Sequence, residues 1–163
     1  MNDNLNDYEK RLASEEQFFE DMAKECPELM QKAQIEYFSV GEGWRQILKI
    51  LCQLISSDVD TARRRLFWAK ESALAGKDDH VAEAEGDYTK ARDELPIIVQ
   101  VKEKFGGLRF YVHNGNERVH SYINFAEAMS TCTCEICGKP GFIGSVRGWE
   151  KTLCDEHQHS TNA

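Results

Sequence analysis

The sequence lacks any run of about 18 apolar residues, and we therefore expect no membrane-spanning helix. Its first residues, MNDNLNDYEK, lack the basic and apolar segments of a secretory signal, so we expect a cytoplasmic protein. Internal repeats and low-complexity tracts are also missing. The length of 163 residues then fits one domain, or a small domain with an appended module.

Negative charge is concentrated near the start of the chain. The formal net charge is −8, and residues 1–30 hold nine acidic and three basic residues, a net of −6. Such a segment repels nucleic acid and suits a basic protein surface. A solvated helix face that keeps the protein soluble explains the same charges equally well.

Apolar residues recur at steps of three and four through residues 5–95, which predicts helices. The first covers about residues 5–25, and Pro27 suits the first turn of a second helix. After the loop SVGEG (39–43), a strongly amphipathic helix is the best candidate for the core. Its apolar face holds Trp44, Ile47, Leu48, Leu51, Leu54 and Ile55.

Residues at about 58–95 predict a helical hairpin that forms an arm. Two runs of apolar residues keep a heptad-like spacing and go out of phase at residues 76–79, where Gly76 suits the end of a helix. One long bent helix is the alternative. The first run is Val59, Ala62, Leu66, Ala69 and Ala73, and the second is Val81, Ala84, Tyr88, Ala91 and Leu95.

Two stretches that alternate apolar and polar residues follow Pro96. They are IIVQVKEKF (97–105) and LRFYVHN (108–114), and the glycine pair between them predicts a β-hairpin. Ile97, Val99 and Val101 would face the core, with Lys102 and Lys104 on the other side. Asn116 then caps a helix whose buried face is Val119, Tyr122, Ile123, Ala126 and Met129.

Four of the six cysteines lie within residues 132–154, a spacing typical of metal binding in a reducing compartment. Cys134 and Cys137, followed by Gly138, have the spacing of a zinc knuckle. Sixteen residues separate this pair from Cys154 and His157, which share one face if they open a helix. Cys132 and His159 are the alternatives for a ligand.

Three thiolates and one imidazole would fill a tetrahedral site, so we expect a structural Zn²⁺ rather than a catalytic one. A short hairpin between the two ligand pairs would complete a treble-clef-like arrangement. The sequence therefore predicts an α+β protein, mostly helical, with one antiparallel β-hairpin and a C-terminal treble-clef-like zinc module. We place the helical body with its arm at residues 1–130 and the zinc-binding module at residues 131–163.

Five segments of the chain resemble a family of small uncharacterised proteins of bacteria and phages. In that family a GW-led helix, a VKEKFGxLRFY hairpin, a short helix and a CxxCG…GWxxTLCxxH module follow in this order. The resemblance implies a fold and no established activity or catalytic residue. The matching segments are GEGW (41–44), VKEKFGGLRFYV (101–112), AEAMS (126–130), CEICGKPG (134–141) and GWEKTLCDEH (148–157).

Catalytic groups are not arranged in any recognisable pattern, so we expect a protein that is not an enzyme. His113 and His120 flank the loop after the hairpin, but nothing fixes them into a triad or an open metal site. We expect a zinc-binding interaction protein, an accessory, inhibitor or immunity protein of a phage or mobile element that binds a host or partner protein. Its oligomeric state is left open.

Two surfaces compete for the binding role. The acidic first helix offers Glu15, Glu16 and Glu20 to a basic protein partner, which we favour. The predicted hairpin offers Lys102, Lys104 and Arg109 beside aromatic residues, which suits phosphate contact and base stacking and makes nucleic acid the alternative partner.

Overall fold

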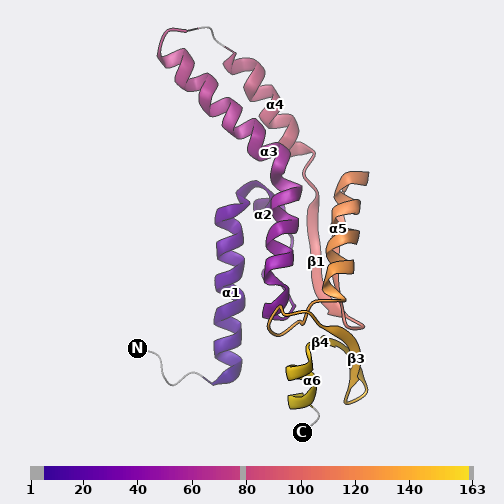
Figure 1. Ribbon diagram of the computed structural model, residues 1–163. Coiled ribbons are helices and arrows are strands. Elements are labelled where there is room, and N and C mark those ends of the chain that lie inside the picture. Colours follow the sequence, from indigo (N-terminus) through magenta and orange to yellow (C-terminus); the bar gives the residue numbers. More distant parts are fainter. Residues whose placement is uncertain (1–5, 78–79, 162–163) are drawn as a thin grey trace.

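The computed structural model describes residues 6–77 and 80–161, and it shows an α+β protein that is mostly helical (Figure 1). Two antiparallel hairpins accompany the helices, one in the body and one in the C-terminal module. No helix of the described residues has the length and apolar character needed to cross a membrane. In chain order the elements are α1 (Asp7–Glu25), α2 (Pro27–Lys32), η1 (Glu42–Trp44), α3 (Arg45–Leu74), α4 (Val81–Asp93), β1 (Ile97–Lys104), β2 (Gly107–His113), α5 (Glu117–Ser130), β3 (Phe142–Val146), β4 (Trp149–Leu153) and α6 (Asp155–Thr161).

The main core is assembled around the first half of α3. Helices α1 and α2 pack on one side of it, α5 packs against both α3 and β2, and α2 contacts β1. The predicted apolar face is confirmed at its centre, whereas Ile47 and Leu54 lie at its edge and are partly exposed. The buried apolar side chains of α3 and of the turn before it are Trp44, Leu48, Leu51, Cys52, Ile55 and Val59.

The β1–β2 hairpin differs from its prediction in phase. Its register shifts between Ile98 and Gln100, which places Ile98 and Val101 together in the core and leaves Val99 half-buried. Such a bulge adds one residue to one strand and reverses the side on which later residues point. The turn also lies one residue earlier than the glycine pair, because Lys104 pairs with Gly107 across Phe105 and Gly106.

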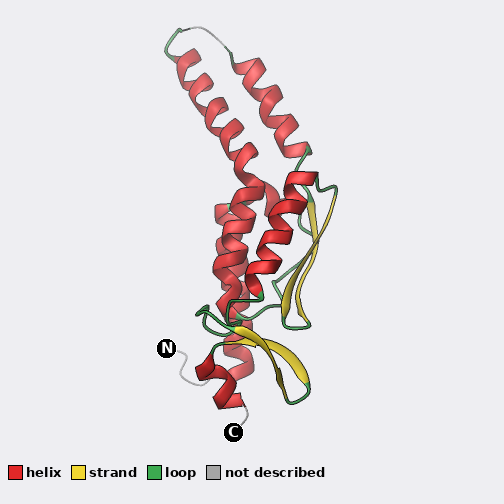
Figure 2. Cartoon of the chain, turned by 45° about the vertical axis from the view of Figure 1, so that its right-hand side comes forward, coloured by secondary structure: helices red, strands yellow, loops and turns green. Residues whose placement is uncertain are grey.

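The arm projects away from the rest of the body (Figure 2). It is a hairpin of two helices, the second half of α3 and α4, as the out-of-phase runs predict. Its first helix is not separate, however, because α3 continues for 30 residues from the core to the tip. Residues of the two predicted runs are among the less exposed residues of the arm, and Arg65 pairs with Glu83 at 2.7 Å.

The base of the arm is fixed by a buried carboxylate on α2. Glu28 accepts a hydrogen bond of 2.9 Å from the Tyr88 hydroxyl of α4. The Arg63 guanidinium of α3 lies 3.4 Å from the same carboxylate and also pairs with Asp60 at 2.5 Å. One buried acid therefore joins both helices of the arm to the body.

Candidate metal centre

The first two predicted ligands lie on a tight turn that follows α5. The Gly138 N–H donates to the Cys134 carbonyl oxygen at 2.9 Å, and the Cys134 N–H donates to the Lys139 carbonyl oxygen at 2.8 Å. Gly138 has a φ of +76°, which side chains disfavour and glycine adopts freely. This turn brings the thiols of Cys134 and Cys137 to the same side of the backbone.

The other two ligands follow the β3–β4 hairpin. That hairpin delivers Cys154 to the start of α6, where the Cys154 carbonyl oxygen accepts the N–H groups of His157 and Gln158 at 3.1 and 3.0 Å. Cys154 and His157 thus sit one helical turn apart on the same face. Knuckle, hairpin and short helix occur in the predicted order.

The four side chains converge on one point. Their ligand atoms all lie within 4.8 Å of one another. The His157 Nδ1 atom is 3.4 Å from the Cys134 sulfur and 3.2 Å from the Cys154 sulfur, and the sulfurs of Cys137 and Cys154 are 3.7 Å apart. A tetrahedral Zn²⁺ with bonds of about 2.3 Å to sulfur spaces its ligands by about 3.8 Å. The cluster therefore could hold a metal ion such as zinc.

The surroundings of Cys134 favour its thiolate form. Burial raises the pKa of this thiol, but hydrogen bonds from the backbone N–H groups of Cys154, Cys137 and Ile136 outweigh burial and lower the pKa to about 6. A thiolate is the form that binds metal. A basic residue of the same module, Lys139, forms an ion pair of 2.8 Å with Glu156 of α6.

The two alternative ligands lie outside the cluster. Cys132 is exposed, and its sulfur is 3.2 Å from the Met129 carbonyl oxygen. His159 is exposed on α6. Neither belongs to the group of converging ligand atoms.

The cluster rests directly on the start of α3. The buried Trp44 donates from Nε1 to the Thr133 carbonyl oxygen at 2.7 Å, and the Gly43 N–H donates to the Glu135 carbonyl oxygen at 2.9 Å. A Cβ atom at Gly43 would lie 2.1 Å from the Cys134 carbonyl oxygen and 2.5 Å from the Gly138 nitrogen. Because both neighbours are backbone atoms, only glycine allows this contact. The knuckle therefore packs directly against the GEGW segment.

The acidic residues predicted to bind a partner lie on α1 in two different settings. Glu16 and Glu20 are exposed, and neither has an ion-pair partner among residues 6–77 and 80–161. Glu15 is half-buried and pairs with Arg11 at 3.5 Å. We call the exposed pair, Glu16 and Glu20, the acidic surface.

The basic residues predicted on the hairpin lie near aromatic rings or a carboxylate. The Lys102 ammonium lies 5.6 Å from the centre of the Tyr111 ring, and that of Lys104 lies 5.0 Å from the centre of the Phe105 ring. Arg109 donates to the Leu108 carbonyl oxygen at 2.7 Å and lies 3.9 Å from the Glu127 carboxylate. The structure places Lys102 and Arg109 opposite each other on neighbouring strands.

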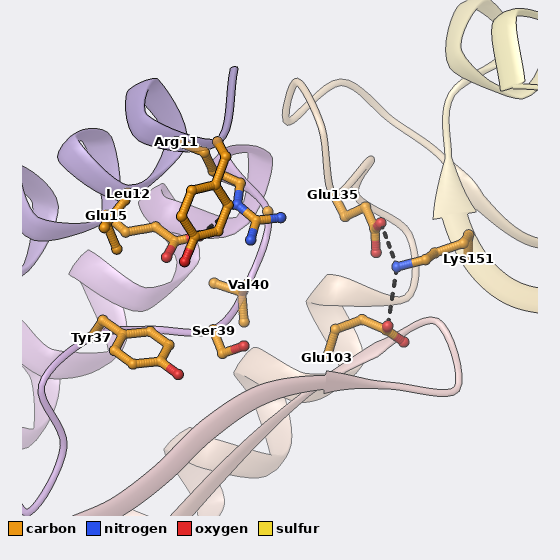
Figure 3. Close-up of a pocket in the computed structure, with 11 residues that line it drawn as sticks. Arg11, Leu12, Glu15, Tyr37, Ser39, Val40, Glu103, Glu135 and Lys151 are labelled. Carbon is orange, nitrogen blue, oxygen red and sulfur yellow. Dashed lines mark hydrogen bonds and ion pairs between the residues drawn. The ribbon is translucent and has the colours of Figure 1, made fainter. Parts of the chain in front are cut away.

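Sequence reasoning missed a group of charged residues where the β1–β2 hairpin and the metal module meet. Lys151 of β4 lies 3.1 Å from the Glu103 carboxylate and 2.8 Å from that of Glu135 (Figure 3). Burial alone lowers the pKa of the Lys151 ammonium, but the hydrogen bonds that it donates to Glu135 and Glu103 outweigh burial and raise the pKa. The three residues come from distant segments, so no local pattern could have shown that they meet.

No protein-family model, curated protein or solved structure matches this chain. The function is therefore inferred from its own residues.

Proposed function

We propose that this chain is a zinc-binding, non-catalytic interaction protein that binds a basic partner protein through α1. The zinc is structural in this proposal, because three thiolates and one imidazole would occupy every tetrahedral position. An accessory, inhibitor or immunity role in a phage or mobile element fits a small binding protein of this kind.

The observation that carries this proposal is the contrast between the two charged surfaces. The cations of the hairpin stack on aromatic rings or approach a carboxylate, whereas Glu16 and Glu20 are exposed and have no ion-pair partner among the described residues. Free exposed charge attracts a partner of the opposite sign and speeds association. An excess of negative charge also opposes binding to nucleic acid.

A groove between α3 and α5 adds support for a protein partner. Its walls are apolar, and Ile50, Leu54, Phe125 and Met129 are exposed along it. Contiguous apolar surface on a folded chain is typical of protein interfaces.

Affinity capture with the tagged full chain tests the proposal. The lysate of the native host is treated with nuclease first, so that any protein retained does not depend on nucleic acid. We expect the wild type to retain a basic protein, and retention to fall as salt rises. Replacing Glu16 and Glu20 with lysine should weaken retention.

The matched control carries Glu71→Lys and Asp93→Lys, which change the net charge equally but lie on the arm, where both acids are exposed and have no ion-pair partner among the described residues. It should retain the partner as the wild type does, apart from the small effect of overall charge. Equal loss in both variants would show that only net charge matters and would contradict a role for α1.

Nucleic acid is the second candidate, favoured by the exposed aromatic rings of the hairpin. Phe105 is 65% exposed and Tyr111 is 41% exposed, and each has a lysine over its ring. Such rings suit base stacking. If nucleic acid co-purifies, and Lys102→Glu with Lys104→Glu abolishes binding while the α1 variant keeps it, this second function replaces the first.

A further inference from the structure

A pocket of about 550 Å³ lies where the first turns of α1 face the metal module. Figure 3 shows its walls: α1, the loop before η1, the β1 end of the hairpin, the knuckle and β4. We call it the α1 pocket. It is separate from the four converging metal ligands, none of which lines it.

The charges of the α1 pocket do not balance. Its walls carry three carboxylates and two cations. Arg11 pairs with Glu15 on the α1 side, and Lys151 is shared by Glu103 and Glu135 on the opposite side. The opposite wall therefore keeps an excess of one negative charge.

One carboxylate oxygen of that wall lacks a hydrogen-bond donor. Glu135 uses Oε1 to bind Lys151, whereas its Oε2 atom is buried and has no partner among the described residues. The Glu135 side chain is only 12% exposed. A buried charged oxygen is stabilised by a donor. A turn of the Glu135 side chain toward the pocket would expose this atom to a cationic group there.

The remaining walls suit an arginine better than a compact ammonium ion. The Tyr37 ring is 49% exposed and offers a face to a planar cation. Leu12 and Val40 supply apolar surface for an aliphatic stem. A guanidinium group has five donors in a rigid plane, so it can reach Glu135 while it stacks on the ring.

We propose that the α1 pocket receives an arginine side chain of the basic partner protein, an inference that rests on the proposed function. The Glu135 side chain turns so that Oε2 accepts hydrogen bonds from the guanidinium, and Lys151 stays between Glu103 and Glu135. The acidic surface on the same helix attracts the partner, and the pocket selects one arginine from it.

A peptide titration tests this pocket without knowledge of the partner. The probe is acetyl-Gly-Arg-Gly-amide, added to the isotope-labelled full chain as purified and followed by NMR. We expect saturable shifts in the backbone amides of residues 37–41. The same peptide with citrulline, which is neutral and has nearly the same shape, should bind about tenfold or more weakly, because bonds to charged groups are the stronger ones.

Variants of the chain locate the binding. Glu135→Gln should weaken binding of the arginine peptide about tenfold or more, whereas Glu71→Gln on the exposed arm should leave it unchanged. If Glu135→Gln loses its metal or its fold, Tyr37→Leu replaces it, since that exposed ring has no role in the core. Tyr37→Leu should also weaken the peptide.

The outcomes separate the two proposals. The proposed arginine site would be refuted if the arginine and citrulline peptides bound equally, or if no saturable shift appeared up to the solubility limit. That result would hold even if a basic protein is captured through α1. Selective binding of the arginine peptide in the pocket, with no basic protein captured, would support the pocket and leave the proposed function refuted.

Discussion

The indole nitrogen of Trp44 donates a hydrogen bond of 2.7 Å to the carbonyl oxygen of Thr133, a residue 89 positions further along the chain. Trp44 is fully buried and ends the turn before α3, and Thr133 directly precedes the first metal ligand. One side chain thus belongs to the body's core and holds the metal module in place.

Replacing Trp44 with phenylalanine should destabilise the protein by about 2–4 kcal/mol, because it leaves a space in the core and a carbonyl oxygen without its donor. Urea denaturation followed by circular dichroism measures the change. Trp149→Phe is the control, since Trp149 is 74% exposed and should change stability little. Equal effects of the two variants would contradict a special role for Trp44.

Gly43→Ala and Gly86→Ala should shift stability in opposite directions. A Cβ atom at Gly43 meets backbone atoms of the knuckle at 2.1 and 2.5 Å, whereas one at Gly86 meets no atom within 4 Å. We expect Gly43→Ala to separate the knuckle from η1 and to lower stability. Gly86→Ala in α4 should raise it by about 0.5–1 kcal/mol, because alanine favours the helix.

Thermal unfolding of both glycine variants is the measurement. A stable Gly43→Ala protein with an unchanged transition would show that the knuckle does not rest on the GEG segment. Loss of stability in Gly86→Ala would show that α4 bends or makes contacts there that the structure lacks.

Cys154→Ser should abolish metal binding, because it removes a ligand that converges with three others. Elemental analysis should give one zinc for each wild-type chain and almost none for the variant. Since structural zinc contributes about 10–16 kcal/mol to folding, the segment that holds the ligands should also become sensitive to protease. Cys132→Ser is the control and should keep its zinc; loss of zinc from it, with zinc retained in Cys134→Ser, would correct the ligand set.

Tyr88→Phe should loosen the base of the arm and cost about 1 kcal/mol at neutral pH, because it removes one donor from the buried Glu28. The amide hydrogen-exchange rates of α4 should also rise in this variant. Arg64→Gln is the control, since the only hydrogen bond of that exposed side chain within the described part of the chain goes to Thr61.

The same tyrosine makes stability depend on alkaline pH. Burial raises the pKa of the Tyr88 phenol, and its hydrogen bond to Glu28 raises it further. The unfolded phenol ionises near pH 10, so this stabilisation is complete below about pH 10 and is lost as pH rises through the higher pKa of the folded state. The wild type should therefore lose more stability than Tyr88→Phe between pH 8 and pH 11, as measured by urea denaturation at each pH.

The parts of the fold that the sequence predicts are those set by local spacing. Short, regular spacings in the sequence mark three of these parts. They are the core face of α3 around Leu51, the two runs of the arm and the two ligand pairs of the metal module. Such spacings therefore indicate both the type of secondary structure and the face of it that is buried. The convergence of Cys134 with His157 follows from chemistry, because four such ligands at these spacings suit a single ion.

Features that depend on contacts between distant segments could not be predicted in this way. The run Ser56–Ser57–Asp58 is unfavourable in an isolated helix, yet it lies inside α3 because neighbouring turns pack against the core. The bulge after Ile98 changes the buried side of β1 with no sign in its composition. The meeting of Lys151 with Glu103 and Glu135 requires the whole fold to be in place.

Helix α3 sets the distance between the two ends of the molecule. At about 1.5 Å per residue its 30 residues span about 45 Å, and the exposed Phe67 and Trp68 rings lie about 35 Å from the GEG segment. A partner domain of about 100 residues has a radius of gyration of about 13 Å, so one centred on either place would not reach the other. Two different molecules can therefore occupy the metal end and the arm together without collision, and a continuous helix would hold them at a fixed separation.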